Sequence, residues 1–194
     1  MVDPLGKVLS LIIPAFEQLG ITYFIGGSVA SGTHGEKRQT NDVDIVVDIK
    51  PDQVAPLVGL LEKEFYADEE MIRDSLEQRS SFNFIHFETA YKVDLFPIKL
   101  RAYDRQVVER SQQHQVDSEP PIEAYTAEPE DIVLAKLEWY RSGGEVSDRQ
   151  WRDILGVLKL QSFTLDFDYM QRWASEIGVG DLLERALNDA GLKE

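Results

Sequence analysis

Three aspartates and one glycine-rich turn are the residues of this chain whose types and spacing suit phosphate and metal chemistry. Residues 26–28 (Gly-Gly-Ser) end an apolar run, Asp42 and Asp44 begin the next one, and Asp94 lies in a later strand-like run. Glycines allow the backbone to approach an anion closely, and the free N–H groups at the start of a helix bind phosphate. Carboxylate oxygens are the ligands that Mg²⁺ prefers. The sequence therefore predicts a site for a nucleoside triphosphate and a divalent cation.

Side-chain alternation in the strand predicted after this turn places two of the acids on one face. Successive side chains of a strand point to opposite faces, so Asp42 and Asp44 share a face while the intervening apolar residues face the core. At a rise of about 3.3 Å per residue their carboxylates stand about 7 Å apart, close enough to reach one or two cations. Asp94 completes a cluster of three if its strand lies beside the first. Arg38 and Thr40 lie where they would steady the phosphates.

Composition limits the proteins to which such a site can belong. The chain has 194 residues, 43% of them hydrophobic, which suits one globular domain with or without a helical annex. It has no cysteine, which excludes a disulfide framework and a thiolate zinc site. An acid near the N-terminus and the lack of an apolar run near ~20 residues predict neither a signal peptide nor a membrane span. We therefore expect a cytoplasmic protein without membrane contact.

The formal charge of −15 bears on the partners of the protein. Such an acidic chain disfavours broad, non-specific binding to nucleic acid or to an anionic membrane. A local basic groove remains compatible with this charge.

The residue pattern changes near residue 120 and predicts an α+β fold. Before this point β-like runs alternate with helical segments, and after it the pattern is helical. We expect a small mixed β-sheet flanked by helices over residues 1–120, followed by a C-terminal helical unit over residues 121–194. The expected strands are 21–25, 43–49, 82–87 and 91–96, with a hairpin link at 88–90.

Capping residues and breakers predict where the helices begin and end. Asp3 caps a helix to about residue 19 that Pro14 bends or interrupts, and Asp52 caps the next helix. Beyond residue 120 the expected helices run from 129 to about 140 and from Ser147 to about 160, and two more open at Asp166 and at residues 180–181.

The order of these motifs resembles the polymerase-beta-like nucleotidyltransferase superfamily. The matching segments are the Gly-Gly-Ser turn, residues 38–44 (Arg-Gln-Thr-Asn-Asp-Val-Asp) and residues 92–94 (Lys-Val-Asp). Within the superfamily the chain looks most like the bacterial AbiEii-type branch, which includes nucleotidyltransferase toxins of type IV toxin–antitoxin systems. The resemblance implies the nucleotidyltransferase fold and Mg²⁺ or Mn²⁺ as cofactor.

The same resemblance implies a role for each matched residue. Gly27 and Ser28 hold the nucleotide. Asp42 and Asp44 bind metal, and Asp94 is the third catalytic and metal-binding acid.

Two later segments are similar to the lysine and aspartate motifs of that branch. They are residues 131–136 and 148–153, and by this likeness Lys136 touches the nucleotide and Asp153 supports the site. Both residues also have a structural explanation. A lysine in an apolar helix often carries its charge to water, and Asp153 fits a helix-surface ion pair with Arg149.

Each motif taken alone has a structural alternative. Gly26 and Gly27 are typical of a plain strand-to-helix turn, and the acids fit the solvated face of an edge strand. Their joint order favours the nucleotide site. His34, His86 and His114 show no metal-ligand spacing and are predicted to be structural or exposed. Trp139, Tyr140, Trp151 and Trp173 are predicted to pack in the core or between the two units.

Other chemistries that use an Asp-x-Asp pair do not fit this chain. In haloacid-dehalogenase-type phosphatases and many glycosyltransferases the apolar strand precedes the pair. Here residues 35–41 before the pair are polar and the apolar run follows it. The order argues against both classes.

Two classes of function remain open. One is an enzyme that moves a nucleoside monophosphate from NTP to an acceptor and releases pyrophosphate, with one cation activating the attacking hydroxyl and another holding the triphosphate. The other is a catalytically inactive nucleotide-binding or regulatory module of a toxin–antitoxin-like system, with an antitoxin-like partner. The three acids favour the enzyme. For the acceptor, tRNA, protein and small molecule stay open.

Overall fold

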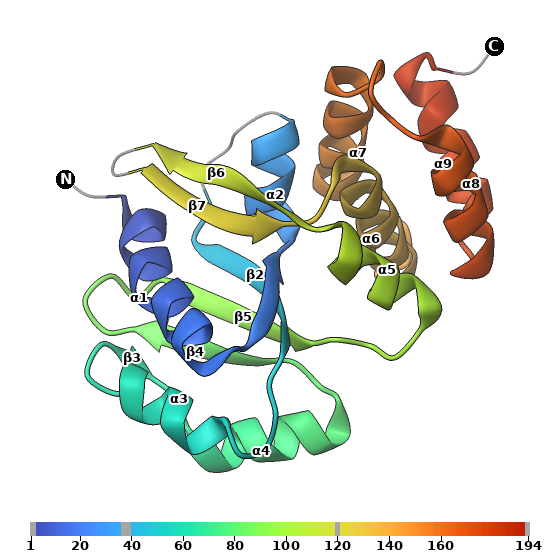
Figure 1. The fold of residues 1–194 in the computed structure, drawn as a ribbon. Helices are drawn as coiled ribbons and strands as arrows, with labels where there is room; N and C mark the ends of the chain where they lie inside the picture. The colour runs from blue at the N-terminus through green and yellow to red at the C-terminus, as the bar shows by residue number, and fades with distance from the viewer. Residues whose placement is uncertain (1–2, 36–39, 119–120, 193–194) are drawn as a thin grey trace.

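A seven-stranded mixed sheet with helices around it organises residues 3–35, 40–118 and 121–192, which the computed structural model describes (Figure 1). The strands are β1 (Thr22–Ile25), β2 (Asp42–Asp48), β3 (Phe65–Tyr66), β4 (Phe82–His86), β5 (Lys92–Pro97), β6 (Gln112–Ser118) and β7 (Pro121–Thr126). The helices are α1 (Pro4–Leu19), α2 (Gly27–His34), α3 (Val54–Leu61), α4 (Glu69–Gln78), α5 (Ala102–Arg110), α6 (Pro129–Ser142), α7 (Asp148–Leu160), α8 (Phe167–Glu176) and α9 (Gly180–Ala190).

The strand β2 lies at the centre of the sheet, whose order is β3-β4-β5-β2-β1-β7-β6. It pairs antiparallel with β1 and parallel with β5, so the sheet is mixed. Alternation along β2 is strict: Val43, Ile45 and Val47 are fully buried, and the residues between them are half-buried. The predicted separation of acids from core residues on this strand is confirmed.

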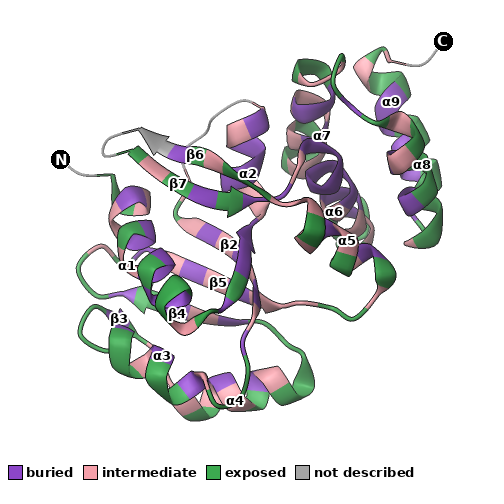
Figure 2. Cartoon of the chain, viewed as in Figure 1, coloured by how far each residue is buried: buried purple, intermediate pink, exposed green. Residues whose placement is uncertain are grey.

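Two hydrophobic clusters form the core. The first packs α1, α3 and α4 against the face of the sheet that carries Val43 and Ile45. The second is built by α6–α9, which Figure 1 shows gathered apart from α1, α3 and α4, and it includes Phe24 and Val46 from the opposite face of the sheet. Buried residues are dense along α6, whereas α8 and α9 also carry exposed ones (Figure 2). The second cluster therefore covers the face of β2 that carries the acids.

Several helix boundaries lie at the predicted residues, although the side chain of Asp3 makes no capping hydrogen bond. Asp3 precedes α1 with proline at its first position, and Gly20 ends it in the left-handed region. The side chains of Ser147 and Asp166 accept hydrogen bonds from backbone N–H groups of α7 and α8. Helix α9 begins at Gly180, as expected.

Two residues predicted to shape the first helices act differently from expectation. Pro14 does not interrupt α1, because it lies on the exposed side while Ile13 and Phe16 hold the helix in the core, and the alternative of a bend at Pro14 stays a prediction. Asp52 does not cap α3, since Gln53 is the flanking residue and its side chain bonds to the backbone of Lys50 and Leu19.

Several elements were not predicted because their apolar pattern is weak. Helices α4 and α5 bury few residues, among them Ile72, Tyr103 and Val107, and β6 is mostly polar. The sheet also extends to Thr126, since β7 pairs with β1 and β6. The change from sheet to helices therefore comes after Thr126, a few residues beyond the change in pattern near residue 120.

No helix of the described ranges 3–35, 40–118 and 121–192 is long and apolar enough to cross a membrane.

Candidate active site

The parallel pairing of β2 and β5 brings the predicted acids together. Asp44 is the register partner of Asp94, and Asp42 is the partner of Lys92. Side chains at paired positions point to the same face, so all three acids lie on the face of the sheet covered by α6. The predicted adjacency of the two strands is confirmed.

The glycine turn reaches Asp44 through a close backbone approach. Gly26 N–H donates to the carbonyl oxygen of Asp44 at 2.9 Å, and Gly27 opens α2 with φ +56°. A Cβ on Gly27 would lie 1.7 Å from Asp44 Oδ2. Glycine is therefore required here both for its backbone conformation and for the space that the carboxylate takes. This contact aims the N-terminus of α2 at the acids.

Negative charge accumulates at Asp44. Burial, followed by the carboxylates of Asp42 and Asp94, raises the pKa of this carboxyl to about 6, against opposite effects of Lys136 and Lys92. The cluster thus has more negative charge than its protein cations balance. A divalent cation would supply the missing positive charge.

The other two acids are held by neighbouring side chains. Lys92 Nζ lies 2.7 Å from Asp94 Oδ2, and the Thr40 hydroxyl donates to Asp42 Oδ1. In the described part of the chain no three His, Asp or Glu side chains are placed so that they could hold a metal ion. The register of β2 with β5 and the alternation along β2 nevertheless gather the three acids on one face. The donor set, three carboxylates on one face, fits the oxygen chemistry of Mg²⁺.

Lys136 reaches the site from α6. It is 8% exposed, and its Nζ lies 2.9 Å from Asp153 Oδ2 on α7. The alternative in which Lys136 carries its charge to water is wrong. Asp153 thus forms a contact between two helices, and its predicted pairing with Arg149 stays a prediction. Because Lys136 also acts on Asp44, it is the cation that faces the acids from the helical side.

A cleft of about 530 Å³ lies between the sheet and helices α5–α7. Six of the nine predicted site residues line it: Gly26, Gly27, Ser28, Asp42, Asp44 and Lys136. Thr40 contacts Asp42 from beside it, and Asp94 is the register partner of Asp44. Arg38 lies outside the described residues.

Aromatic residues of this cleft were not predicted as site residues. Trp139 is 56% exposed and lines the cleft, and its ring contacts Phe96 of β5, so of its two predicted places it lies between the units and not in the core. Tyr140 and Trp173 are buried, as predicted. A signal for Trp139 exists in the sequence, because Ile132, Lys136 and Trp139 recur at helical spacing on one face of α6.

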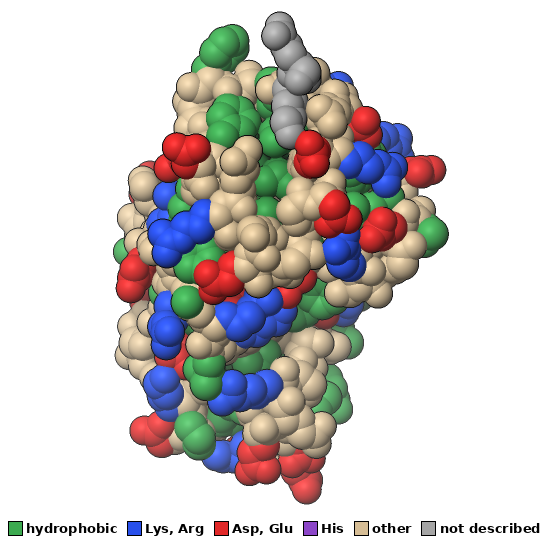
Figure 3. Space-filling model, turned by 90° about the vertical axis from the view of Figure 1, so that its right-hand side faces the viewer, with side chains coloured by type: hydrophobic (Ala, Val, Ile, Leu, Met, Phe, Trp, Pro, Cys, Tyr) green, Lys and Arg blue, Asp and Glu red, His purple; other side chains and the backbone are tan. Residues whose placement is uncertain are grey.

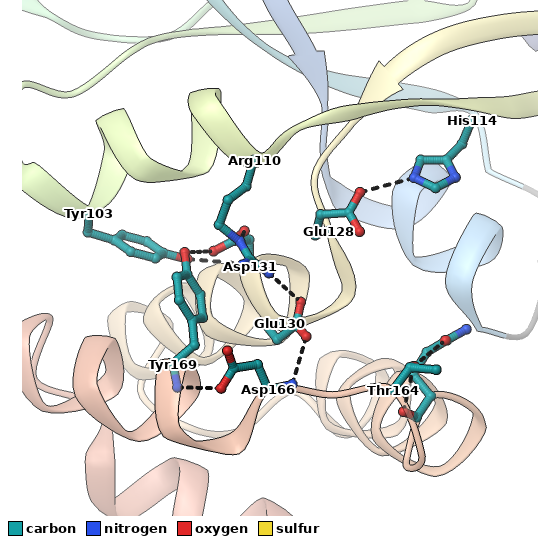
Figure 4. Close-up of polar contacts among 10 residues, drawn as sticks. Tyr103, Arg110, His114, Glu128, Glu130, Asp131, Thr164, Asp166 and Tyr169 are labelled. Carbon is teal, nitrogen blue, oxygen red and sulfur yellow. Dashed lines mark hydrogen bonds and ion pairs between the residues drawn. The ribbon is translucent and has the colours of Figure 1, made fainter.

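A buried polar network anchors the first turn of α6 (Figure 4). Arg110 of α5 donates to Glu130 at 2.8 Å and to Asp131 at 3.3 Å, and its guanidinium lies 4.0 Å from the centre of the Tyr169 ring. The Tyr169 hydroxyl donates to Asp131 at 2.6 Å, and Glu130 accepts from the backbone N–H of Asp166. Burial raises the pKa of Asp131 to about 6. The network joins α5, α6 and α8 and so orients the helix that carries Lys136.

Solved structures with this architecture are known. The antibiotic-resistance factor ANT(2'')-Ia, studied in solution, matches with a TM-score of 0.56 and 11% identity over 97% of this chain and 96% of that one. An antigenic nucleotidyltransferase-like protein from Paracoccidioides brasiliensis matches with a TM-score of 0.55 and 17% identity, over 96% and 93%. The chain has a nucleotidyltransferase fold. ANT(2'')-Ia in complex with adenylyl-2''-tobramycin also matches, with a TM-score of 0.52 and 11% identity over 90% and 97%. No protein-family model and no curated protein matches the sequence.

The nucleotidyltransferase fold confirms the predicted class, a mixed sheet flanked by helices and followed by C-terminal helices. At these identities the likeness concerns the fold alone. The roles of individual residues rest on the geometry of this chain.

Proposed function

We propose that this protein is a metal-dependent nucleotidyltransferase that moves a nucleoside monophosphate from NTP to an acceptor. The observation that carries the proposal is the approach of Gly27 to Asp44, within the register that pairs Asp44 with Asp94. A plain strand-to-helix turn does not need a glycine against a carboxylate. A glycine against a carboxylate is needed where a turn presents helix N–H groups beside a cluster of acids, because the phosphate oxygens and their cation must meet there.

The reaction assigned to this site conserves charge and atoms. The acceptor oxygen forms a bond to the α-phosphorus of NTP, and the bond from that phosphorus to the β-phosphate bridging oxygen breaks. Pyrophosphate leaves, and the hydroxyl proton passes to Asp94. Ser28 and the N-terminus of α2 bind the triphosphate, and Lys136 faces it from α6.

Mg²⁺ or Mn²⁺ bound by Asp42, Asp44 and Asp94 would neutralise the phosphates and lower the pKa of the attacking hydroxyl. The raised pKa of Asp44 supports this assignment, since burial raises it first and the neighbouring carboxylates of Asp42 and Asp94 add to the effect of burial. Lys92 would then stabilise the orientation of Asp94, and Thr40 that of Asp42, around the bound cation.

We infer a small molecule as acceptor. The cleft volume of about 530 Å³ is in the range of small-molecule sites. Lys and Arg side chains on the face shown in Figure 3 are intermixed with Asp and Glu, unlike the basic stripe of a nucleic-acid surface. The structural neighbour ANT(2'')-Ia has been solved with adenylyl-2''-tobramycin. Membership of the AbiEii-type branch and an antitoxin-like partner stay predictions from the motifs.

Label transfer tests the proposal directly. The protein is incubated with each α-labelled NTP, Mg²⁺ or Mn²⁺ and a cell extract, and the labelled products are separated. We expect one NTP to label an acceptor, and we expect Asp42→Asn/Asp44→Asn to reduce the rate by about a thousandfold or more, on the order of the loss of one strong electrostatic contribution to catalysis.

The matched control is Asp48→Asn. Asp48 lies on the same face of β2, but its carboxylate pairs with Lys50 at 2.6 Å and is 46% exposed. This variant should label the acceptor at the parental rate. Equal transfer by the double variant and the parent would contradict the proposed chemistry. Binding of NTP without transfer by the parent would favour the inactive nucleotide-binding module.

A further inference from the structure

The cleft contains an apolar half beside the acids. Phe24, Val46 and Phe96 are register partners across β1, β2 and β5. They lie two residues beyond the row formed by Asp44 and Asp94 and point to the same face, about 7 Å away at the rise of a strand. The floor of the cleft thus changes from carboxylate to apolar within one step along the strands.

Helix α6 repeats this change on the opposite wall. Lys136 faces the acids, and Trp139, three residues later on the same face, lies over Phe96 with ring centres 5.8 Å apart at 68°. The edge contact with Phe96 leaves 56% of Trp139 exposed. An aromatic ring of this size with an open face is suited to a second flat ring. We call Phe24, Val46, Phe96, Tyr103, Ile132 and Trp139 the apolar half.

The carboxylates bordering the apolar half already have cationic partners. Arg101 binds Asp104 at 2.6 Å and Glu138 at 2.6 Å, and Lys99 lies 3.3 Å from Glu138. A polycationic ligand would have to displace these pairs. An uncharged ring would leave them intact and gain the apolar contact, so the charge pattern favours an uncharged occupant.

Within the apolar half, the position of Phe96 and Trp139 distinguishes acceptor from nucleotide. The N-terminus of α2, which would hold the triphosphate, follows β1 on one side of β2. Phe96 and Trp139 lie on the other side, over β5, whose Asp94 would take the proton of the acceptor. A hydroxyl that reaches Asp94 therefore brings the body of its molecule over Phe96.

We propose that the apolar half binds a flat, uncharged ring of the acceptor next to its reacting hydroxyl, so that the acceptor is an aromatic alcohol in class. This inference rests on the proposed nucleotidyl transfer. Phe96 and Trp139 then determine which acceptors bind, while the three acids carry out the transfer.

Equilibrium binding tests the apolar half independently of catalysis. Naphthylmethanol is titrated into the protein, and the indole N–H signals of the tryptophans are followed by NMR. We expect the Trp139 signal to shift and Trp139→Ala to raise the dissociation constant roughly tenfold, the order of a lost aromatic contact and its buried area. Trp139→Phe keeps a ring and should stay within about twofold of the parent.

Phe163→Ala is the matched control, because Phe163 is fully exposed between α7 and α8 and does not line the cleft. It should bind naphthylmethanol as the parent does. Equal binding by Trp139→Ala and the parent would overturn the proposal. Tighter binding of tobramycin, a polycation, than of naphthylmethanol would also overturn it. A loss of affinity for a non-hydrolysable NTP analogue in Trp139→Ala would overturn it as well, because Trp139 would then contact the nucleobase.

A second measurement separates this inference from the proposed function. Transfer of label from NTP is compared for naphthylmethanol and glycerol, and we expect the aromatic alcohol to be used at least tenfold better by kcat/KM in the parent, a preference that Trp139→Ala loses. Glycerol used as well as naphthylmethanol would overturn the aromatic acceptor. Binding of naphthylmethanol by a protein that labels neither naphthylmethanol nor any component of the cell extract would contradict the nucleotidyl transfer and leave the ring-binding site supported.

Discussion

At the scale of single residues, Gly27 is required both for the backbone conformation of the turn and for the position of the Asp44 carboxylate. Its φ of +56° is unfavourable for residues with a Cβ, and the missing Cβ leaves room for the Asp44 carboxylate. A turn of ordinary structural glycines would show only the first requirement. Gly27 meets both, so a substitution there should affect stability and activity together.

We expect Gly27→Ala to lower the free energy of unfolding by about 2 kcal/mol or more, the sum of left-handed strain and a displaced carboxylate. The matched control is Gly59→Ala in α3, where an added Cβ meets nothing within 4 Å. That helical substitution should raise the free energy of unfolding by about 0.5 kcal/mol. Urea unfolding of both variants measures the difference, and similar stability of the two variants would refute the close contact with Asp44.

At the scale of elements, the position of α6 decides what faces the acids. Its first turn is joined to α5 and α8 by Arg110, Asp131 and Tyr169, and its middle presents Lys136 to the sheet. The network lies one to two turns before Lys136 on the same rigid helix. Loss of the network should therefore change the orientation of Lys136 without removing a group from the site.

The buried carboxyl of Asp131 predicts a pH effect on stability. Burial raises its pKa to about 6 from an ordinary 3.8, although Tyr169 and Arg110 oppose this effect. The folded state thus binds more protons than the unfolded state between these values, so the free energy of unfolding falls as pH rises from about 4 to about 6. The loss from this group is up to about 3 kcal/mol.

Asp131→Asn removes this titration. We expect the curve of unfolding free energy against pH to fall less steeply between pH 4 and 6 in Asp131→Asn than in the parent, as measured by urea unfolding at several pH values. Asp168→Asn, which removes an exposed carboxyl of α8, is the control for the loss of one charge. Parallel curves for Asp131→Asn and the parent would show that Asp131 is not the titrating group.

At the scale of the whole molecule, the cleft lies between the sheet and the helices that build the second hydrophobic cluster. The sheet contributes the acids and the floor, and α5–α7 contribute Lys136, Tyr103 and Trp139. A ligand in the cleft contacts the sheet and residues of the second cluster, among them Phe24, Tyr103 and Ile132. Its binding energy should therefore add to the stability of the folded chain as a whole.

Nucleotide and metal should together raise the melting temperature. With Mg²⁺ and a non-hydrolysable NTP analogue at about a hundredfold excess over the dissociation constant, the gain is about 2.7 kcal/mol, or roughly 5 °C or more for a chain of this size. Removal of Mg²⁺ by EDTA should reverse most of the shift. Differential scanning fluorimetry measures it, with Asp48→Asn expected to behave as the parent and Asp42→Asn/Asp44→Asn to show little shift. A shift of equal size in EDTA would contradict the metal requirement.

Local patterns in the sequence were sufficient for much of the fold and for the outline of the site. The alternation of Asp42 and Asp44 with buried valine and isoleucine, and the caps of α7 and α8, depend on near neighbours in the chain. These predictions are confirmed. Weakly apolar elements such as α4 and β6 escaped prediction, because packing against the rest of the molecule stabilises them more than local propensity does.

Contacts between distant segments were decided only by the tertiary structure. The register that pairs Asp44 with Asp94, the approach of Gly27 to Asp44 and the ion pair of Lys136 with Asp153 join residues that the sequence separates by 17 to 50 positions. The partial exposure of Trp139 likewise depends on α6 crossing β5 and not on the local sequence. Strand periodicity and capping preferences act over a few residues, so the sequence by itself determined which side chains share a face. Which faces meet, and hence what the cleft presents to a ligand, follows from packing of the sheet against the helices.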